Sequence, residues 1–222
     1  SYSTIYRSIY SGDLETEKLS HGQRGAARKL RHRGKTRRRK GTEERRGKIV
    51  VSHSIEERPD EARHRTELGH WEADTVAGKT GSSCMITLAD RKSRFVLGKR
   101  IARKTAAEVE EGMIALLITL PPELRRSVTP DRGKEFASHP RVSAALDGLP
   151  FYFPNPHAPW ERGTNENTNG LIREYCPKSV DMNSFDNSYF DDFISKLNLR
   201  PRKCLGWKSP SEVFFGLVLH LT

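Results

Sequence analysis

The net charge of this 222-residue chain is confined to one short tract, and that confinement limits which residues can fold together. The chain carries +11 at neutral pH. Residues 24–48 hold 13 lysines and arginines and two acids, whereas the other residues are neutral overall, with 26 basic and 26 acidic side chains. So basic a tract buries too little apolar surface to fold alone. We therefore expect an extended basic arm there and a packed domain after it.

The apolar residues set the expected boundaries of that domain. Residues 1–14 place apolar side chains at helical spacing and predict a short helix. Residues 15–67 are polar and basic, and we interpret them as an extended linker. Residues 68–199 carry most of the periodic apolar pattern and form the expected domain, with residues 200–222 as a C-terminal extension.

From residue 68 onward, short apolar runs alternate with longer amphipathic stretches. The runs predict five strands, and the second and third flank a turn that makes them an antiparallel hairpin. The expected strands are 70–76, 84–88, 95–101, 127–129 and 151–153. The expected helices are 105–120, 137–146, 161–175, 184–199 and a last short one capped by Ser209. Strands interleaved with helices predict an α/β fold, with a mixed five-stranded sheet flanked by helices.

Neither a zinc site nor a membrane span is expected. Cys84, Cys176 and Cys204 are odd in number and far apart, and no C-x-x-C pair exists. Structural zinc is therefore not predicted, and a reducing compartment fits. No apolar run reaches the roughly 20 residues that cross a bilayer, and no signal-peptide pattern opens the chain.

Three acidic residues in three separate segments are candidates for one metal site. Asp74 lies on the first predicted strand, where alternation puts Glu72 and Asp74 on the same face. Asp131 follows a short strand, and Glu166 lies near the start of a helix. Three carboxylates brought together can hold two divalent cations, which is the apparatus for cutting and joining phosphodiesters. Glu72 is the rival ligand.

Each of the three acids also has a structural interpretation. Asp74 alone fits a solvated strand residue. Asp131 precedes a glycine-bearing turn and fits ordinary turn chemistry, although Lys134 beside it suits a phosphate. Glu166 lies in the run N-E-N-T-N-G, a poor helix sequence, and fits a helix start capped by Thr164.

Three segments together resemble the DDE transposases of bacterial insertion sequences, in particular the family of insertion sequence thirty, with a catalytic core like that of retroviral integrases. They are His70-Trp71-Glu72-Ala73-Asp74, Asp131-Arg132-Gly133-Lys134-Glu135-Phe136 and the run 159–173, and residues 200–203 and 205–210 also match. The resemblance implies an RNase H-like fold in which Asp74, Asp131 and Glu166 are catalytic and hold two Mg²⁺ or Mn²⁺ ions. Two departures, Ala73 in place of glycine and Pro130 before the second acid, remove no ligand but alter local backbone geometry.

The same resemblance implies cleavage and strand transfer at the ends of a mobile element. The implied partner is double-stranded DNA, both the terminal inverted repeats and the target, bound by a homodimer or larger oligomer in the bacterial cytoplasm at the nucleoid, with no membrane partner. Residues 1–14 then correspond to the last helix of a helix-turn-helix region that lies mostly outside this chain. Two alternatives stay open: a structure-selective nuclease of the same fold without strand transfer, and a DNA-binding module without chemistry.

The basic tract and the polar side chains near the three acids are candidates for DNA contact. Basic side chains bind backbone phosphates with little sequence preference and steep salt dependence. A solvated linker is the alternative for the tract. The expected DNA-binding residues are Arg31, Arg33, Lys35, Arg37, Arg38, Arg39, Lys40, Arg45, Arg46, Lys134, Arg162, Asn167, Asn169 and Arg173.

Overall fold

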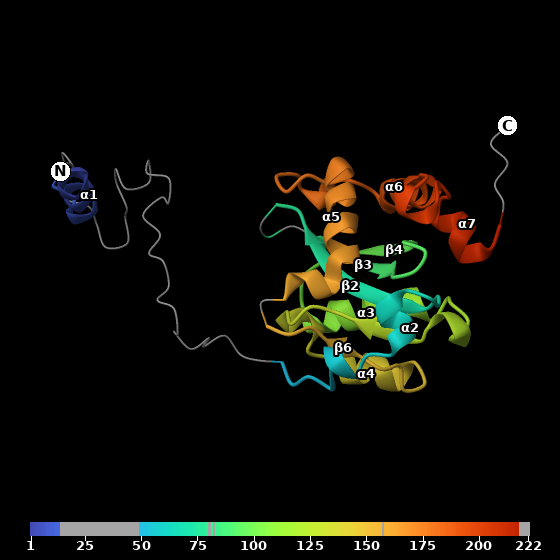
Figure 1. Cartoon of the computed structure of the whole chain (residues 1–222). Helices are drawn as coiled ribbons and strands as arrows, with labels where there is room; N and C mark the ends of the chain where they lie inside the picture. The colour runs from blue at the N-terminus through green and yellow to red at the C-terminus, as the bar shows by residue number, and fades with distance from the viewer. Residues whose placement is uncertain (14–48, 80, 82, 157, 218–222) are drawn as a thin grey trace. The chain divides into compact units, whose positions relative to one another are not determined.

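A computed structural model describes residues 1–13, 49–79, 81, 83–156 and 158–217 (Figure 1). The chain divides into two compact units, Ser1–Arg46 and Gly47–Thr222. In the first unit, helix α1 (Tyr2–Ser11) lies within the predicted range 1–14 and ends at Gly12, whose φ of 86° is left-handed. Residues 14–48, which include the whole basic tract, lie outside the described residues.

A four-stranded sheet in the order β4-β3-β2-β5 forms the centre of the second unit. Its strands are β2 (His70–Ala77), β3 (Cys84–Asp90), β4 (Val96–Ile101) and β5 (Ser127–Thr129). β3 pairs antiparallel with both β2 and β4, whereas β5 pairs parallel with β2. The predicted hairpin and the mixed sheet are therefore confirmed. The carboxylate of Asp90 closes the hairpin turn by accepting the backbone N–H of Ser93 at 2.7 Å.

The predicted fifth strand lies elsewhere. β6 (Tyr152–Phe153) pairs in parallel with β1 (His53–Ser54) in a separate two-stranded sheet. One isolated bridge, between Phe151 and Val128, joins this segment to β5. Prolines stand just before and just after the predicted strand, and proline offers no N–H to a strand ladder. The five-strand count is therefore not confirmed, because the main sheet has four strands among the described residues.

The helices lie where amphipathic stretches predict them, apart from the short α2. They are α2 (Asp60–His64), α3 (Ala106–Leu117), α4 (His139–Ala145), α5 (Gly163–Tyr175), α6 (Asn187–Leu199) and α7 (Pro210–Phe215). Short 3-10 turns are η2 (Ile55–Glu57), η3 (Pro122–Leu124), η4 (Lys134–Phe136), η5 (Pro159–Arg162), η6 (Met182–Ser184) and η7 (Lys203–Leu205). Ser209 and Glu212 form the predicted capping box of α7.

Helices cover both faces of the main sheet, so the second unit has three layers (Figure 1). α3 and α4 lie on one face, and α5 and α6 lie on the other. Alternation along β2 divides its side chains between the two faces. Trp71 and Ala73 belong to the apolar core on the α3 side, whereas Val76 packs with Ile172 and Phe193 on the α5 side.

Segments on both sides of the predicted domain pack onto it. In the predicted linker, Ile55 and Ala62 are buried. In the predicted C-terminal extension, Phe214 is buried and stacks on Phe95 with ring centroids 4.4 Å apart. The packed unit thus includes residues outside 68–199. Among the described residues, no helix is long and apolar enough to cross a membrane.

Candidate active site

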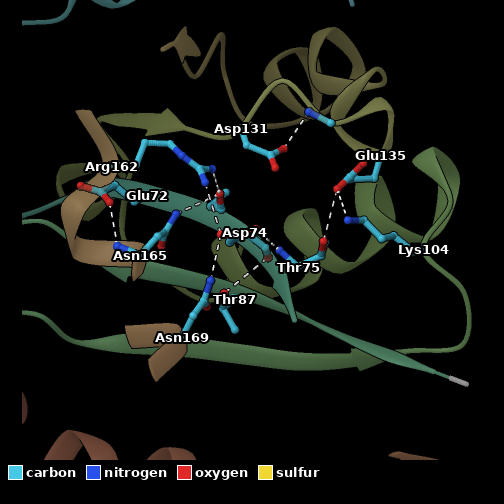
Figure 2. Close-up of polar contacts among 12 residues, drawn as sticks. Glu72, Asp74, Thr75, Thr87, Lys104, Asp131, Glu135, Arg162, Asn165 and Asn169 are labelled. Atoms are coloured by element: carbon cyan, nitrogen blue, oxygen red, sulfur yellow. Dashed lines mark hydrogen bonds and ion pairs between the residues drawn. The ribbon is translucent and has the colours of Figure 1, made fainter. Parts of the chain in front are cut away.

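Asp74 lies in the middle of β2, on the face of the sheet that α5 covers. Its side chain is 14% exposed. Its Oδ1 accepts the backbone N–H of Thr75 at 2.8 Å. Its Oδ2 accepts hydrogen bonds from Asn169 Nδ2 at 2.9 Å and from Arg162 Nη2 at 3.3 Å (Figure 2). The strand on one side and the helix on the other therefore hold this carboxylate in one orientation.

Asp131 approaches Asp74 from the neighbouring strand. β5 runs parallel to β2 and ends at Thr129, opposite Glu72, so Asp131 leaves β5 at about the level of Asp74. Asp131 Oδ1 accepts the backbone N–H of Gly133 at 2.8 Å. Burial raises the pKa of Asp131, and the charge of Asp74 acts in the same direction, although Gly133 and Arg162 oppose it. Two carboxylates that influence each other in this way form a pair that a divalent cation stabilises.

A further carboxylate and a lysine lie beside this pair, and neither was predicted as a site residue. Lys104 Nζ lies 2.5 Å from Glu135 Oε1, which also accepts a hydrogen bond from Thr75 Oγ1 at 3.3 Å (Figure 2). Burial acts to lower the pKa of Lys104, but the bond and charge of Glu135, with the charges of Asp131 and Asp74, outweigh burial and raise it. Glu135 was visible in the same motif as Asp131, whereas Lys104 carries no local signal.

Glu72, the rival ligand, is fully buried and already has two partners. One oxygen forms an ion pair with Arg91, and the other accepts the backbone N–H of Asn165 at 2.9 Å. Arg91 in turn donates its Nε to the carbonyl of Ala62 at 2.7 Å. Because both oxygens are occupied, Glu72 anchors the first turn of α5 and is not placed to hold a metal.

Glu166 shares a face of α5 with residues that contact β2, but it does not contact the other two acids. Side chains three, four or seven residues apart share a helix face, which groups Glu166 with Arg162, Asn169 and Arg173. The first and second of these bond Asp74, and Arg173 Nη1 donates to a carbonyl at the end of β2 at 2.7 Å. Glu166 itself is exposed. Within the described part of the chain, no three His, Cys, Asp or Glu side chains lie close enough to hold one ion.

Comparison with known proteins places this site in a family context. No protein-family model matches the chain. The chain is 39% identical to the transposase for insertion sequence element IS1086 of Cupriavidus metallidurans, over 100% of this chain and 64% of that protein. It is 40% identical to the transposase InsI for insertion sequence element IS30A of Escherichia coli, over 95% of this chain and 54% of that protein. By sequence, this chain is similar to IS30-type transposases along nearly its whole length. It spans between half and two thirds of the length of these relatives.

A solved structure shows the same fold. The catalytic core domain of the BIV integrase superposes with a TM-score of 0.50 and covers 67% of this chain and 94% of that domain. Sequence identity is 17%, so this likeness concerns the fold alone. The RNase H-like arrangement implied by the three motifs of this chain is therefore confirmed at the level of the mixed sheet and its flanking helices.

The donor set of the site suits a hard divalent cation. Mg²⁺ and Mn²⁺ prefer carboxylate oxygens, and Asp74 and Asp131 supply them from neighbouring parallel strands. Arg162 donates to Asp74 and to the carbonyl of Ala73, each at 3.3 Å, which is beyond the usual range of such bonds. A guanidinium held this loosely competes weakly with a divalent cation. Glu166 is exposed and is not part of this pair.

The predicted DNA-binding residues fall into three groups. The nine basic residues between Arg31 and Arg46 lie outside the described residues. Lys134 and Asn167 are exposed close in sequence to Asp131 and Glu166. Arg162, Asn169 and Arg173 bond β2 and so order α5 against the sheet. Contact of each group with DNA stays a prediction.

Proposed function

We propose that this chain is the catalytic region of a DNA transposase that cleaves and joins strands at the ends of a mobile element. In this proposal Asp74, Asp131 and Glu166 form the catalytic triad of a polynucleotidyl transferase. One observation carries it. Asp74 on β2 and Asp131 just after the parallel strand β5 lie within reach of each other's charge in an integrase-like fold, in a chain about 40% identical to insertion-sequence transposases.

The proposed chemistry divides between the protein and its metal ions. Two Mg²⁺ or Mn²⁺ ions held by the triad would activate the attacking oxygen and stabilise the leaving oxygen of an in-line displacement. The chain's own part is positioning. The N–H groups of Thr75 and Gly133 fix the orientations of Asp74 and Asp131, and Lys104 limits the excess of negative charge beside them. No protein side chain becomes covalently joined to DNA.

The proposed DNA ligand is double-stranded, and the protein acts on it as a dimer or larger assembly. The net charge of +11 lies in residues 24–48, and a tract of this kind binds backbone phosphates with steep salt dependence. Two element ends must be held together during strand transfer, so a single active site is not sufficient. These partners come from the implied reaction and from charge, and a measurement of assembly state on DNA tests them.

Conservative substitution of the three acids tests the proposed function. Asp74→Asn, Asp131→Asn and Glu166→Gln should each lower the rate of cleavage of terminal DNA by roughly 10³-fold or more, because several kcal/mol of transition-state stabilisation is lost. Glu174→Gln is the matched control, since Glu174 lies near the C-terminal end of α5 and pairs with the exposed Arg200 at 3.1 Å. Calorimetry with Mn²⁺ on each variant should show weaker or fewer bound ions.

Two outcomes would contradict the proposal. Wild-type cleavage rates in all three variants would show that Asp74, Asp131 and Glu166 are not the catalytic residues. Cleavage without joining of pre-cut ends to a target duplex would identify a structure-selective nuclease instead of a transposase.

A further inference from the structure

Four arginines from separate segments lie near Glu72 and act on one another. Arg58 follows η2, Arg65 ends α2, and Arg91 and Arg94 lie in the turn between β3 and β4. Burial lowers the pKa of Arg65, and the charges of Arg94 and Arg91 lower it further. Burial likewise lowers the pKa of Arg58, with Arg65 acting in the same direction. The four guanidinium groups, called the arginine cluster below, therefore lie within reach of one another's fields.

The acids around the arginine cluster do not balance its charge. Glu72 and Glu161 face it. Glu72 is fully engaged by Arg91 and by the first turn of α5. Glu161 is engaged by Asn155, whose N–H donates to it at 2.8 Å. Four positive and two negative charges leave the cluster with an excess of positive charge.

Arg58 shows the lack of compensating partners most directly. The residue is 7% exposed, and its Nε and Nη1 atoms are buried without a hydrogen-bond partner in the described structure. A buried guanidinium without partners is costly, since its desolvation is not compensated. The positive charge of Arg58 is therefore poorly compensated inside the protein.

The backbone gives a second, independent observation. Among the described residues, four other than glycine have positive φ, and two of them are Arg65 at 61° and Arg94 at 64°. The left-handed conformation costs a side-chain-bearing residue about 1–2 kcal/mol, and glycine avoids that cost. An arginine in this conformation at two positions of one cluster favours a use for the two guanidinium groups.

The arginine cluster lies next to the candidate active site. Arg94 Nη1 donates to Thr164 Oγ1 at 2.9 Å, at the start of α5. Glu72 precedes Asp74 by two strand residues, which is about 7 Å along β2. A DNA strand whose phosphodiester reaches Asp74 thus passes close to the cluster.

We propose that Arg65 and Arg94, with Arg58 and Arg91 buried behind them, bind a backbone phosphate of the DNA close to the reacting phosphodiester. The planar guanidinium forks of Arg65 and Arg94 match phosphate oxygens, and the poorly compensated charge of Arg58 adds to the attraction. The ligand rests on the proposed function, because that function makes DNA the substrate. The contact positions the strand and reads no bases.

Glycine substitution separates charge from folding. Arg65→Gly removes one guanidinium and relieves a left-handed backbone, so its thermal unfolding midpoint should stay level or rise. Arg94→Gly relieves the same strain but also loses the bond to Thr164, so its binding is compared below its own unfolding midpoint. Binding of a fluorescein-labelled duplex, followed by anisotropy between about 50 and 200 mM KCl, should show a salt slope smaller by about 0.9 for each phosphate that the variant no longer neutralises. The titration is run with the full chain in EDTA, so that no catalysis is needed.

Three controls fix the interpretation. Arg94→Lys keeps the charge and should keep most of the slope. Arg141→Ala removes the same charge from α4, where Arg141 is 76% exposed, and should change the slope much less. Inorganic phosphate alone should raise the unfolding midpoint of the wild type by less than duplex DNA does.

Two results would overturn the proposal. Salt slopes equal to the wild type in both glycine variants would leave the cluster a structural feature. Inorganic phosphate could instead raise the unfolding midpoint of the wild type but not that of Arg94→Gly. If the salt slope of DNA binding were then unchanged in this variant, the cluster would be a site for small anions. Neither result depends on the three acids. Full cleavage activity in the Asp74, Asp131 and Glu166 variants would reject the proposed function, whereas the DNA-binding titration tests the arginine cluster separately.

Discussion

The first half of α5 and its second half hold the helix against the sheet by different means. From Gly163 to Gly170 the helix is rich in Asn, Thr and Gly, which are poor helix formers, and its contacts with β2 are polar. Asn165 donates to the carbonyl of Ala73 at 3.1 Å. In the second half, Ile172 is fully buried and Tyr175 stacks on Phe193 with centroids 5.3 Å apart.

The two halves of α5 therefore have different roles: one stabilises the packing of the helix, and the other positions its side chains. Apolar burial is not directional, so the second half of α5 anchors the helix but tolerates small shifts. Hydrogen bonds fix distance and angle, so the first half places its side chains on β2 at defined points. Glu166 lies in the first half, and its place relative to Asp74 therefore depends on the polar contacts.

Loss of the Glu72 charge should have the largest effect on the polar half. Glu72→Gln leaves Arg91 buried without a counter-charge, and breaking a buried pair typically costs about 3–5 kcal/mol. Urea denaturation should show a loss of this size. Calorimetry should also show weaker Mn²⁺ binding to the native variant, since the first turn of α5 loses its anchor.

A double variant is the control for that result. Adding Arg91→Met to Glu72→Gln removes the unpaired charge and should recover part of the stability. A loss below about 1 kcal/mol in the single variant would mean that the ion pair does not hold the polar half.

Truncation of the apolar half should affect stability alone. Ile172→Ala leaves a cavity in the cluster that includes Phe193 and should lower the free energy of unfolding by about 3 kcal/mol. Mn²⁺ affinity of the folded variant should stay within about twofold of the wild type, a change of only ~0.4 kcal/mol. A parallel fall in metal affinity would show that the two halves are not separable.

The smallest expected effect has the opposite sign. Gly170→Ala adds a methyl group where nothing lies within 4 Å, so better helix propensity should raise stability by about 0.5–1 kcal/mol in urea denaturation. Gly112→Ala in α3 is the matched control, because its Cβ would lie 3.2 Å from Ile101 and Ile86. Equal gains at both positions would contradict the assignment of weak intrinsic helicity to the polar half.

Local pattern predicted most of the fold. The helix predicted over 161–175 is α5, and the hairpin around Asp90 has the expected pairing. Such elements follow from spacing and from turn chemistry, which are written in adjacent residues. The partner of β6 is not written there, because β1 lies about a hundred residues earlier and has no strand pattern of its own.

The candidate site divides in the same way. Asp74 and Asp131 could be placed near each other because their positions follow from two neighbouring strands. The ion pair that occupies Glu72 could not be predicted, since its partner Arg91 lies in a turn distant in sequence from the strand of Glu72. Lys104 was missed for a similar reason: it meets Glu135 only after α3 and η4 pack together.

The contacts of Asn165 with Glu72 and of Asn169 with Asp74 also set the register between α5 and β2. Four residues of helix rise about 6 Å, and two residues of strand rise about 6.6 Å. The two spacings nearly agree, so two residues four apart on the helix can each contact one of two residues that are two apart on the strand. One residue inserted into β2 between Glu72 and Asp74 would turn Asp74 to the opposite face of the sheet. One residue inserted into α5 between Asn165 and Asn169 would turn Asn169 away from Asp74.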